Sequence, residues 1–395
     1  MTQFEKWAFQ ILALLLPWSV DVDLGNWNLT LPSEPLIAFL GILLAWRITR
    51  TGWNQQRNNK LLIVSFIWIC WSAVCALLSD LKTISMKYWI VDAGHWWVFF
   101  VGMAFYPELW RRVLPYFRYS MLGVVVYTLI RHGQFDFRVD QALLAPMPFF
   151  PDHTMYAAVL TMLIWLPAAP GVRILEAAGL ALSTCRAAVL SLVTAMTAFA
   201  GFHWRKRVLW LVLSAVVLLA GIVAVAPRLN RSIQNDVSMQ ERFNRWHCAT
   251  EMMAQKPLFG SGPGTYAFVY FPYQRTENLT RISVFEPLTE RGPATYGRGG
   301  GAHSEYMQAG AENGLMGLLI WLVLSVGSLW LGFSQAAATE NSSQKKYLLL
   351  LTLGLFTYLL HALLNNFLHD GRIAFLYWGM LTELSRPSFP EISSS

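Results

Sequence analysis

Long uninterrupted apolar runs are the feature that most constrains how this chain can fold. Two of them, 61–79 and 208–226, reach the roughly 20 apolar residues that a helix needs to cross a bilayer. The chain of 395 residues is 55% hydrophobic and only 13% charged. Soluble domains carry about 25% charged residues. Together these values predict a polytopic integral membrane protein of the all-α class.

Further apolar runs bring the prediction to about twelve transmembrane helices, several of them short for a full span. The runs lie at 7–20, 35–48, 61–79, 88–105, 117–131, 154–169, 172–184, 187–202, 208–226, 313–333, 346–364 and 371–385. The predicted divisions are N-terminal transmembrane helices at 1–150, central ones at 151–226, one long loop at 227–312 and C-terminal helices at 313–395.

Short basic loops predict the orientation, because lysine and arginine collect on the cytoplasmic side. With the N-terminus in the cytoplasm, four basic loops all lie inside. They contain Arg47, Arg50, Arg57 and Lys60, then Arg111 and Arg112, then 203–207, then Lys345 and Lys346. The loops with the other unusual polar residues then lie outside: 150–153, 183–186, 227–312 and 365–370. Loop arginine also accounts for the net charge of +7, so no nucleic acid partner is expected.

The segment 227–312 is far longer than an ordinary loop, which marks it as functional or disordered. Its aromatic content favours a folded segment. An amphipathic helix is predicted at 236–256, ending before Pro257. Four residues at steps of three and four share one face of this helix: Phe243, Trp246, Thr250 and Met253.

This segment is rich in arginine but has only one lysine, Lys256. Its arginines are Arg228, Arg231, Arg242, Arg245, Arg275, Arg281, Arg291 and Arg298. Guanidinium groups bind phosphate in a bidentate manner and are weakly hydrated, so they suit partly buried anion sites. A phosphate-bearing substrate and anionic membrane lipid are both compatible with this composition.

Two residues outside the common pattern of membrane helices are candidates for chemistry. Arg186 lies between two apolar runs, where an ionisable residue is costly and indicates a site or a headgroup contact. His303 lies just before a long apolar run and is a candidate general base, or a helix cap. Asp92 and His95, inside the run 88–105, are expected to pair across one helical turn.

Two motifs resemble those of one bacterial family. The pattern His-Ser-Glu-Tyr-x-Gln-x-x-x-Glu-x-Gly-x-x-Gly at 303–317 resembles the hallmark of the O-antigen ligase/polymerase superfamily. The segment 182–188 resembles the Ser-Arg-Gly-Ala helix start of that family, with Cys185 in place of Ser and Ala187 in place of Gly.

Three more segments strengthen the resemblance. The segments 242–246 and 256–264 resemble the periplasmic region of the family, and 152–157 resembles a variant of the helix start before the ligase core. The resemblance extends over roughly 150–380, with its motifs in the family's order around one long external loop.

The resemblance implies a membrane glycosyltransferase of the GT-C type in the bacterial inner membrane, with its active site on the periplasmic side and no metal or cofactor. The implied donor is a glycan on undecaprenyl pyrophosphate. The implied acceptor is a hydroxyl of lipid A-core or of a growing glycan, attacking with inversion.

Family roles carry over to three residues: Arg186 and Arg242 bind the pyrophosphate and assist catalysis, and His303 activates the acceptor hydroxyl. Arg245 is the rival of Arg242. Arg275 and Arg281 are further candidates for the same anion. The resemblance gives supporting roles to Glu305, Tyr306 and Glu312.

Several functions remain open on the sequence alone. A ligase, a polymerase that extends lipid-linked repeats, and a transferase with a protein acceptor would use the same residues. A transporter, with Asp92, Arg186 and His369 as pathway residues, would be favoured by inverted repeats with broken helices. No such repeat is visible in the sequence.

Overall fold

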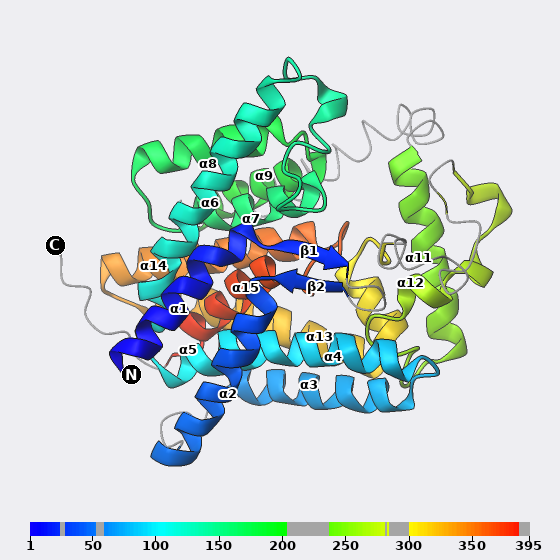
Figure 1. The fold of residues 1–395 in the computed structure, drawn as a ribbon, viewed down its shortest axis with the longest axis horizontal. Coiled ribbons are helices and arrows are strands. Elements are labelled where there is room, and N and C mark those ends of the chain that lie inside the picture. Colours follow the sequence, from blue (N-terminus) through cyan, green and yellow to red (C-terminus); the bar gives the residue numbers. More distant parts are fainter. Residues whose placement is uncertain (24–27, 53–58, 204–236, 281–282, 284–299, 387–395) are drawn as a thin grey trace.

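The computed structural model describes residues 1–23, 28–52, 59–203, 237–280, 283 and 300–386 (Figure 1). The predicted span 208–226 lies outside these residues. So do several arginines named above: Arg57, Arg228, Arg231, Arg281, Arg291 and Arg298.

Helices dominate the described residues, as the apolar runs predicted. The elements up to residue 133 are α1 (Gln3–Leu15), β1 (Val20–Asp23), β2 (Asn28–Leu31), α2 (Ser33–Thr51), α3 (Lys60–Leu78), α4 (Lys82–His95), α5 (Gly102–Phe105) and α6 (Leu109–Gly133). A π-helical segment, Trp96–Val101, joins α4 to α5.

Each predicted span within the described residues overlaps a helix, but 7–20 continues past α1 to the start of β1, and 88–105 includes the end of α4, the π-helical segment and α5. The later elements are α7 (His153–Trp165), α8 (Pro170–Leu182), α9 (Arg186–His203), α11 (Val237–Gln255), α12 (Tyr266–Val269), α13 (Glu305–Ala338), α14 (Ser342–His361) and α15 (Gly371–Leu384). Short 3-10 turns occur between several of them.

By length and composition, three of the described helices can cross a membrane: Lys60–Leu78, Leu109–Gly133 and Glu305–Ala338. Others are apolar but shorter. For example, α7 has 13 residues, which span about 20 Å, less than the ~30 Å of a bilayer core. The count of about twelve full spans therefore stays a prediction.

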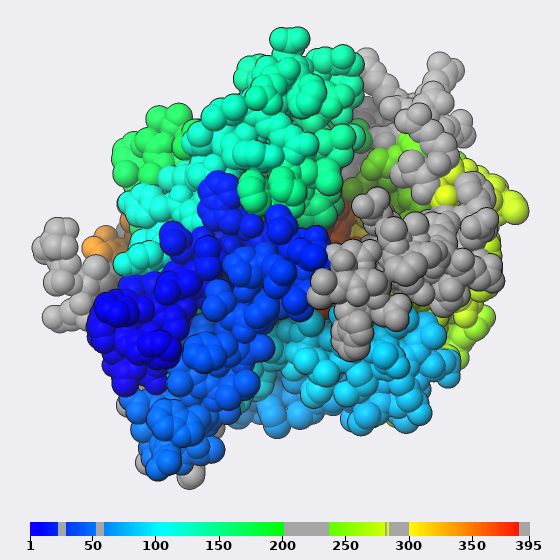
Figure 2. Space-filling model, in the orientation of Figure 1, coloured from blue at the N-terminus to red at the C-terminus, as the bar shows by residue number. Residues whose placement is uncertain are grey.

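A small β-hairpin departs from the predicted all-α fold. Strands β1 and β2 pair antiparallel, with Val20 opposite Leu31. The sequences VDVD and NLTL alternate apolar and polar residues, the two-residue period typical of strands. Figure 2 shows the hairpin and α2, in blue, between the surface of α6 and the cyan surface of α3 and α4.

At the centre of the fold, α15 is buried on nearly all sides. A helix that is apolar all round can be placed only inside a bundle or a membrane. The segment α11–α12 lies at one end of the molecule, beside the start of α13, whereas the N-terminus of α1 lies at the opposite end (Figure 1).

The start of α13 differs from the prediction. The sequence predicted a loop up to residue 312, but the helix begins at Glu305 and breaks at Gly314, whose φ is 71° and ψ is 179°. This backbone region favours glycine. An added Cβ at Gly314 would lie 2.0 Å from the carbonyl oxygen of Leu258, so only glycine fits there.

The segment 257–264 binds the backbone groups that the break exposes. The amides of Ser261 and Gly262 donate to the carbonyls of Ala311 (3.0 Å) and Glu312 (2.8 Å). The amide of Leu315 donates to the carbonyl of Pro257 at 2.8 Å. Groups that a continuous helix would satisfy internally thus find partners in the loop.

Candidate functional site

The site is built around α11, which confirms the helix predicted at 236–256. The predicted face is only partly right. Trp246 and Met253 face the start of α13, but Phe243 is 42% exposed. The buried residues of α11 form a more polar stripe: Glu241, Asn244, Arg245, Cys248, Ala249 and Met252.

Arg245 is held entirely inside this segment. Its Nε donates to Glu241 Oε1 at 2.9 Å, and the two side chains are 5% and 2% exposed. Its Nη1 donates to the carbonyls of Gly300 and Gly301, both at 3.0 Å, and the guanidinium lies 4.8 Å from the ring centre of Tyr270. These contacts make Arg245 a structural residue.

Glu241 needs further donors, because a buried carboxylate is costly unless its lone pairs are used. Its second oxygen accepts hydrogen bonds from Thr280 Oγ1 (3.1 Å) and Ser283 Oγ (2.6 Å). The ion pair therefore fixes α11 to the segments that approach it from 280 and from 300.

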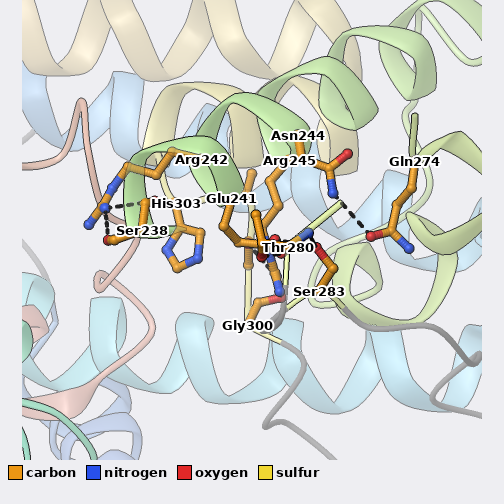
Figure 3. A network of polar contacts seen from close by, with 12 residues as sticks. Ser238, Glu241, Arg242, Asn244, Arg245, Gln274, Thr280, Ser283, Gly300 and His303 are labelled. Carbon is orange, nitrogen blue, oxygen red and sulfur yellow. Dashed lines mark hydrogen bonds and ion pairs between the residues drawn. The ribbon is translucent and has the colours of Figure 1, made fainter. Parts of the chain in front are cut away.

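Arg242, next to Glu241 in the sequence but on a different face of α11, contacts other parts of the molecule. Its Nε donates to the carbonyl of Leu364 at 3.1 Å and its Nη1 to the carbonyl of Ser238 at 3.1 Å. Figure 3 shows His303 beneath α11, between Arg242 and the pair of Glu241 and Arg245.

His303 is held in an unusual backbone conformation with φ at 52°, which side chains other than glycine and asparagine seldom adopt. Its amide donates to Asn366 Oδ1 at 3.1 Å, and its carbonyl accepts from Trp246 Nε1 at 3.4 Å. These contacts aim the imidazole at α11 while Ser304 caps α13.

Burial and the positive charges of Arg245 and Arg242 lower the pKa of His303 to about 3. Both effects disfavour the imidazolium. The ring is therefore neutral near pH 7 and has a nitrogen lone pair that can accept a proton.

The charge of Arg242 also reaches a second group of side chains, formed by His153, Cys185 and His361. Cys185 Sγ lies 3.8 Å from His361 Nε2. Burial raises the pKa of Cys185, so its thiol stays neutral. Arg186 follows directly as the first residue of α9 and is exposed. Arg242 therefore acts electrostatically on the residue that precedes α9.

Glu305 organises the backbone around His303. Its Oε1 accepts from the amides of Phe367 and Leu368 and from Tyr358 Oη, the last at 3.1 Å. Its own amide donates to the carbonyls of Ala362 and Asn365. Glu305 therefore anchors the loop after α14 to the start of α13.

Glu312 and Tyr306 have comparable positions. Glu312 Oε1 accepts from the amide of Tyr266 (2.9 Å) and from Gln308 Nε2 (2.6 Å), which joins the 257–266 segment to α13. Tyr306 Oη donates to the carbonyl of Leu359 at 3.0 Å. The side chains of all three residues thus connect α13 to neighbouring segments.

Of the remaining predicted arginines, the structure describes only Arg275. Arg275 is exposed before a short 3-10 helix, and its described contacts do not link it to His303. Arg281 lies outside the described residues. In the part of the chain that the structure describes, no cluster of three or more His, Cys, Asp or Glu is placed to hold a metal ion.

Sequence reasoning paired Asp92 with His95, and this was wrong. Asp92 Oδ1 lies 2.7 Å from His369 Nδ1 instead, and His95 is buried against Phe99. Asn366, the partner of His303, was also missed. Its only signal was the polar composition of the loop 365–370.

The low pKa of His303 predicts a pH dependence of stability. An unfolded histidine takes up a proton near pH 6.5, whereas the folded one does so only near pH 3, so acid favours the unfolded chain. The contribution of the neutral His303 to the free energy of unfolding is complete above pH 6.5 and is about 2 kcal/mol smaller at pH 5. Thermal unfolding measured above pH 6.5 and at pH 5 should show that acid lowers the stability of His303→Asn less than that of the wild type. An equal loss in both proteins would contradict the assignment.

Residues 172–322 match the model of the O-antigen ligase family. This match supports the resemblance to the O-antigen ligase superfamily that the motifs indicated. The match supports a membrane glycosyltransferase of the O-antigen ligase or polymerase type. A comparison with curated proteins found no match. The O-antigen ligase segment contains Arg186, Arg242 and His303, whereas Asp92, His361 and His369 lie outside it.

Proposed function

We propose that this chain transfers a glycan from undecaprenyl pyrophosphate to an acceptor hydroxyl on the periplasmic face of the bacterial inner membrane. The arrangement that carries the proposal is His303 beneath α11 next to Arg242 (Figure 3), where burial and the charges of Arg245 and Arg242 lower the pKa of the imidazole. Arg186 begins α9 directly after Cys185, and the charge of Arg242 acts on the thiol of Cys185. The polymerase reaction, in which the acceptor is a growing glycan, would use the same groups.

In the proposed reaction the acceptor oxygen attacks the anomeric carbon while the bond from that carbon to the pyrophosphate oxygen breaks. The acceptor proton passes to His303, and the electron pair leaves with the pyrophosphate. A single displacement of this kind inverts the anomeric centre. Arg242 and Arg186 stabilise the departing negative charge, so no metal is needed for that purpose. Such preorganised electrostatic stabilisation is usually the largest catalytic term.

The donor itself would strengthen the base. In the free protein, burial and two guanidinium groups disfavour the protonated form of His303. A bound pyrophosphate places negative charge beside those groups and offsets them, which raises the proton affinity of the imidazole. His303 would then accept a proton most readily when the donor is in place.

A complementation experiment tests this function. The gene is deleted in its host, and surface glycans are separated on gels after return of the wild type, His303→Asn or Arg186→Ala. Both variants should fail to restore the glycans. Arg138→Ala, which breaks an exposed ion pair with Asp140, is the matched control and should restore them.

The products separate the two reactions. Uncapped lipopolysaccharide together with accumulated lipid-linked polymer indicates a ligase, and loss of long chains alone indicates a polymerase. Full restoration by both site variants would rule out the proposed site.

A further inference from the structure

A second cluster of polar side chains lies outside the O-antigen ligase segment. His369 Nδ1 is 2.7 Å from Asp92 Oδ1, and the ring of Tyr88 stacks on His369 with a centroid distance of 4.3 Å and an interplanar angle of 23°. The side chains of His369 and Asp92 are 43% and 39% exposed. The polar groups of the cluster are therefore partly exposed on the described chain.

One loop connects this cluster to the proposed site. Arg242 donates to the carbonyl of Leu364, His303 donates to the side chain of Asn366, and His369 contacts Asp92. His369 is the third residue after Asn366, so their backbones are at most about 11 Å apart. The order along the loop is arginine, histidine, then the Asp92–His369 pair.

A purely structural role does not account for the pair. The loop is already fixed by the two amides that donate to Glu305 and by the ion pair of Asp370 with Arg372. An exposed ion pair adds little stability. Asp92 also lies within the predicted span 88–105, where an ionisable residue is costly and is expected to have a function.

The contacts of His369 determine how its imidazole ring is oriented and which nitrogen can meet a ligand. Because Nδ1 bonds to Asp92 and the ring stacks on Tyr88, the orientation of Nε2 is set. Burial lowers the pKa of His369, but the charge of Asp92 outweighs it and the net pKa is raised. Since the carboxylate of Asp92 accepts from Nδ1–H, the outward Nε2 accepts a hydrogen bond in the neutral ring and donates one in the protonated ring, which Asp92 favours.

We propose that Asp92, His369 and Tyr88 form an acceptor subsite that binds neighbouring hydroxyl groups of the sugar whose hydroxyl His303 deprotonates. The proposal rests on the proposed glycan transfer. An outward imidazole nitrogen beside a carboxylate acceptor matches two adjacent hydroxyl groups, because a hydroxyl can donate to the nitrogen or accept from it. Along the loop, the Arg242 contact at Leu364 comes before Asn366 and the subsite comes after it. Donor and acceptor would therefore bind at different ends of the loop.

Two substitutions of His369 separate binding from structure. Asparagine places its amide nitrogen where Nδ1 is and keeps the contact with Asp92, but it removes the outward nitrogen. Glutamine places its amide nitrogen near Nε2 and keeps the outward donor. If His369 binds the acceptor, His369→Asn should therefore lose more activity than His369→Gln. If His369 has only a structural role, His369→Gln should lose more.

The test uses the purified full chain in proteoliposomes, an undecaprenyl-pyrophosphate-linked glycan as donor, and core-only lipopolysaccharide or a soluble oligosaccharide of the repeat unit as acceptor. His369→Asn and Asp92→Asn should raise the KM for the acceptor about tenfold or more, since a charged hydrogen bond is lost. The KM for the donor should stay within about twofold of the wild-type value. Asp80→Asn, which breaks the exposed ion pair with Lys256, is the control and should change neither.

Three results would overturn the subsite. One is an unchanged acceptor KM in His369→Asn, and another is an equal rise in the donor KM. The third is more activity retained by His369→Asn than by His369→Gln. Thermal unfolding of each variant shows that the chain is folded. Failure of the wild type to transfer glycan to either acceptor would count against the proposed function instead.

Discussion

Replacing His303 by asparagine is expected to lower kcat by about 100- to 10,000-fold, the usual contribution of a general base. Asparagine is the informative substitution because residue 303 has φ at 52°, a conformation that asparagine adopts more readily than alanine. The backbone should therefore stay in place while the imidazole is lost. Initial rates at saturating donor and acceptor measure the effect.

His247→Asn is a suitable control for this experiment. His247 lies on α11, close to the site, but its contact is with Glu251 at 3.8 Å and not with Arg242. Its rate should stay near that of the wild type. A fall of less than about tenfold in His303→Asn, with normal thermal unfolding, would mean that another group removes the proton.

Arg242 and Arg245 should differ sharply when each is replaced by methionine. Arg245→Met leaves Glu241 as a buried, unpaired charge, which is expected to cost about 3–5 kcal/mol of stability. Arg242→Met removes hydrogen bonds from a half-buried surface, so it should unfold near the wild-type temperature but lose transfer activity. Thermal unfolding and glycan transfer, measured on the same samples, separate the two effects.

The double variant Glu241→Gln with Arg245→Met extends the test. Removing both charges should recover part of the stability that Arg245→Met loses, because the unpaired carboxylate is gone. Equal losses of stability in Arg242→Met and Arg245→Met would show that the structural role is not specific to Arg245.

Local signals in the sequence predicted the positions of helices well. Pro257 and the spacing of apolar residues predicted α11 to within one residue at each end. The buried face of α11 was not predictable, because Glu241 and Arg245 are stabilised by partners near 280 and 300 that no local pattern reveals.

The same limit explains the errors at the start of α13 and at Asp92. The polar residues between 303 and 312 suggested a loop, but their side chains bond to backbone groups near 266 and 367 and so are buried in a helix. His303 and Arg242 were identified by motif. Asn366 is 63 residues from His303 and His369 is 277 residues from Asp92, so only the folded chain brings them together.

The broken helix α13 has a mechanical consequence. Main-chain hydrogen bonds at Gly314 tie it to 257–264, directly after α11, while Trp246 and Arg245 tie α11 to the residues just before α13. The helix that carries the guanidinium and the segment that carries the imidazole are thus clamped at two points. Their separation is set while the chain folds, so the incoming lipid does not have to assemble it.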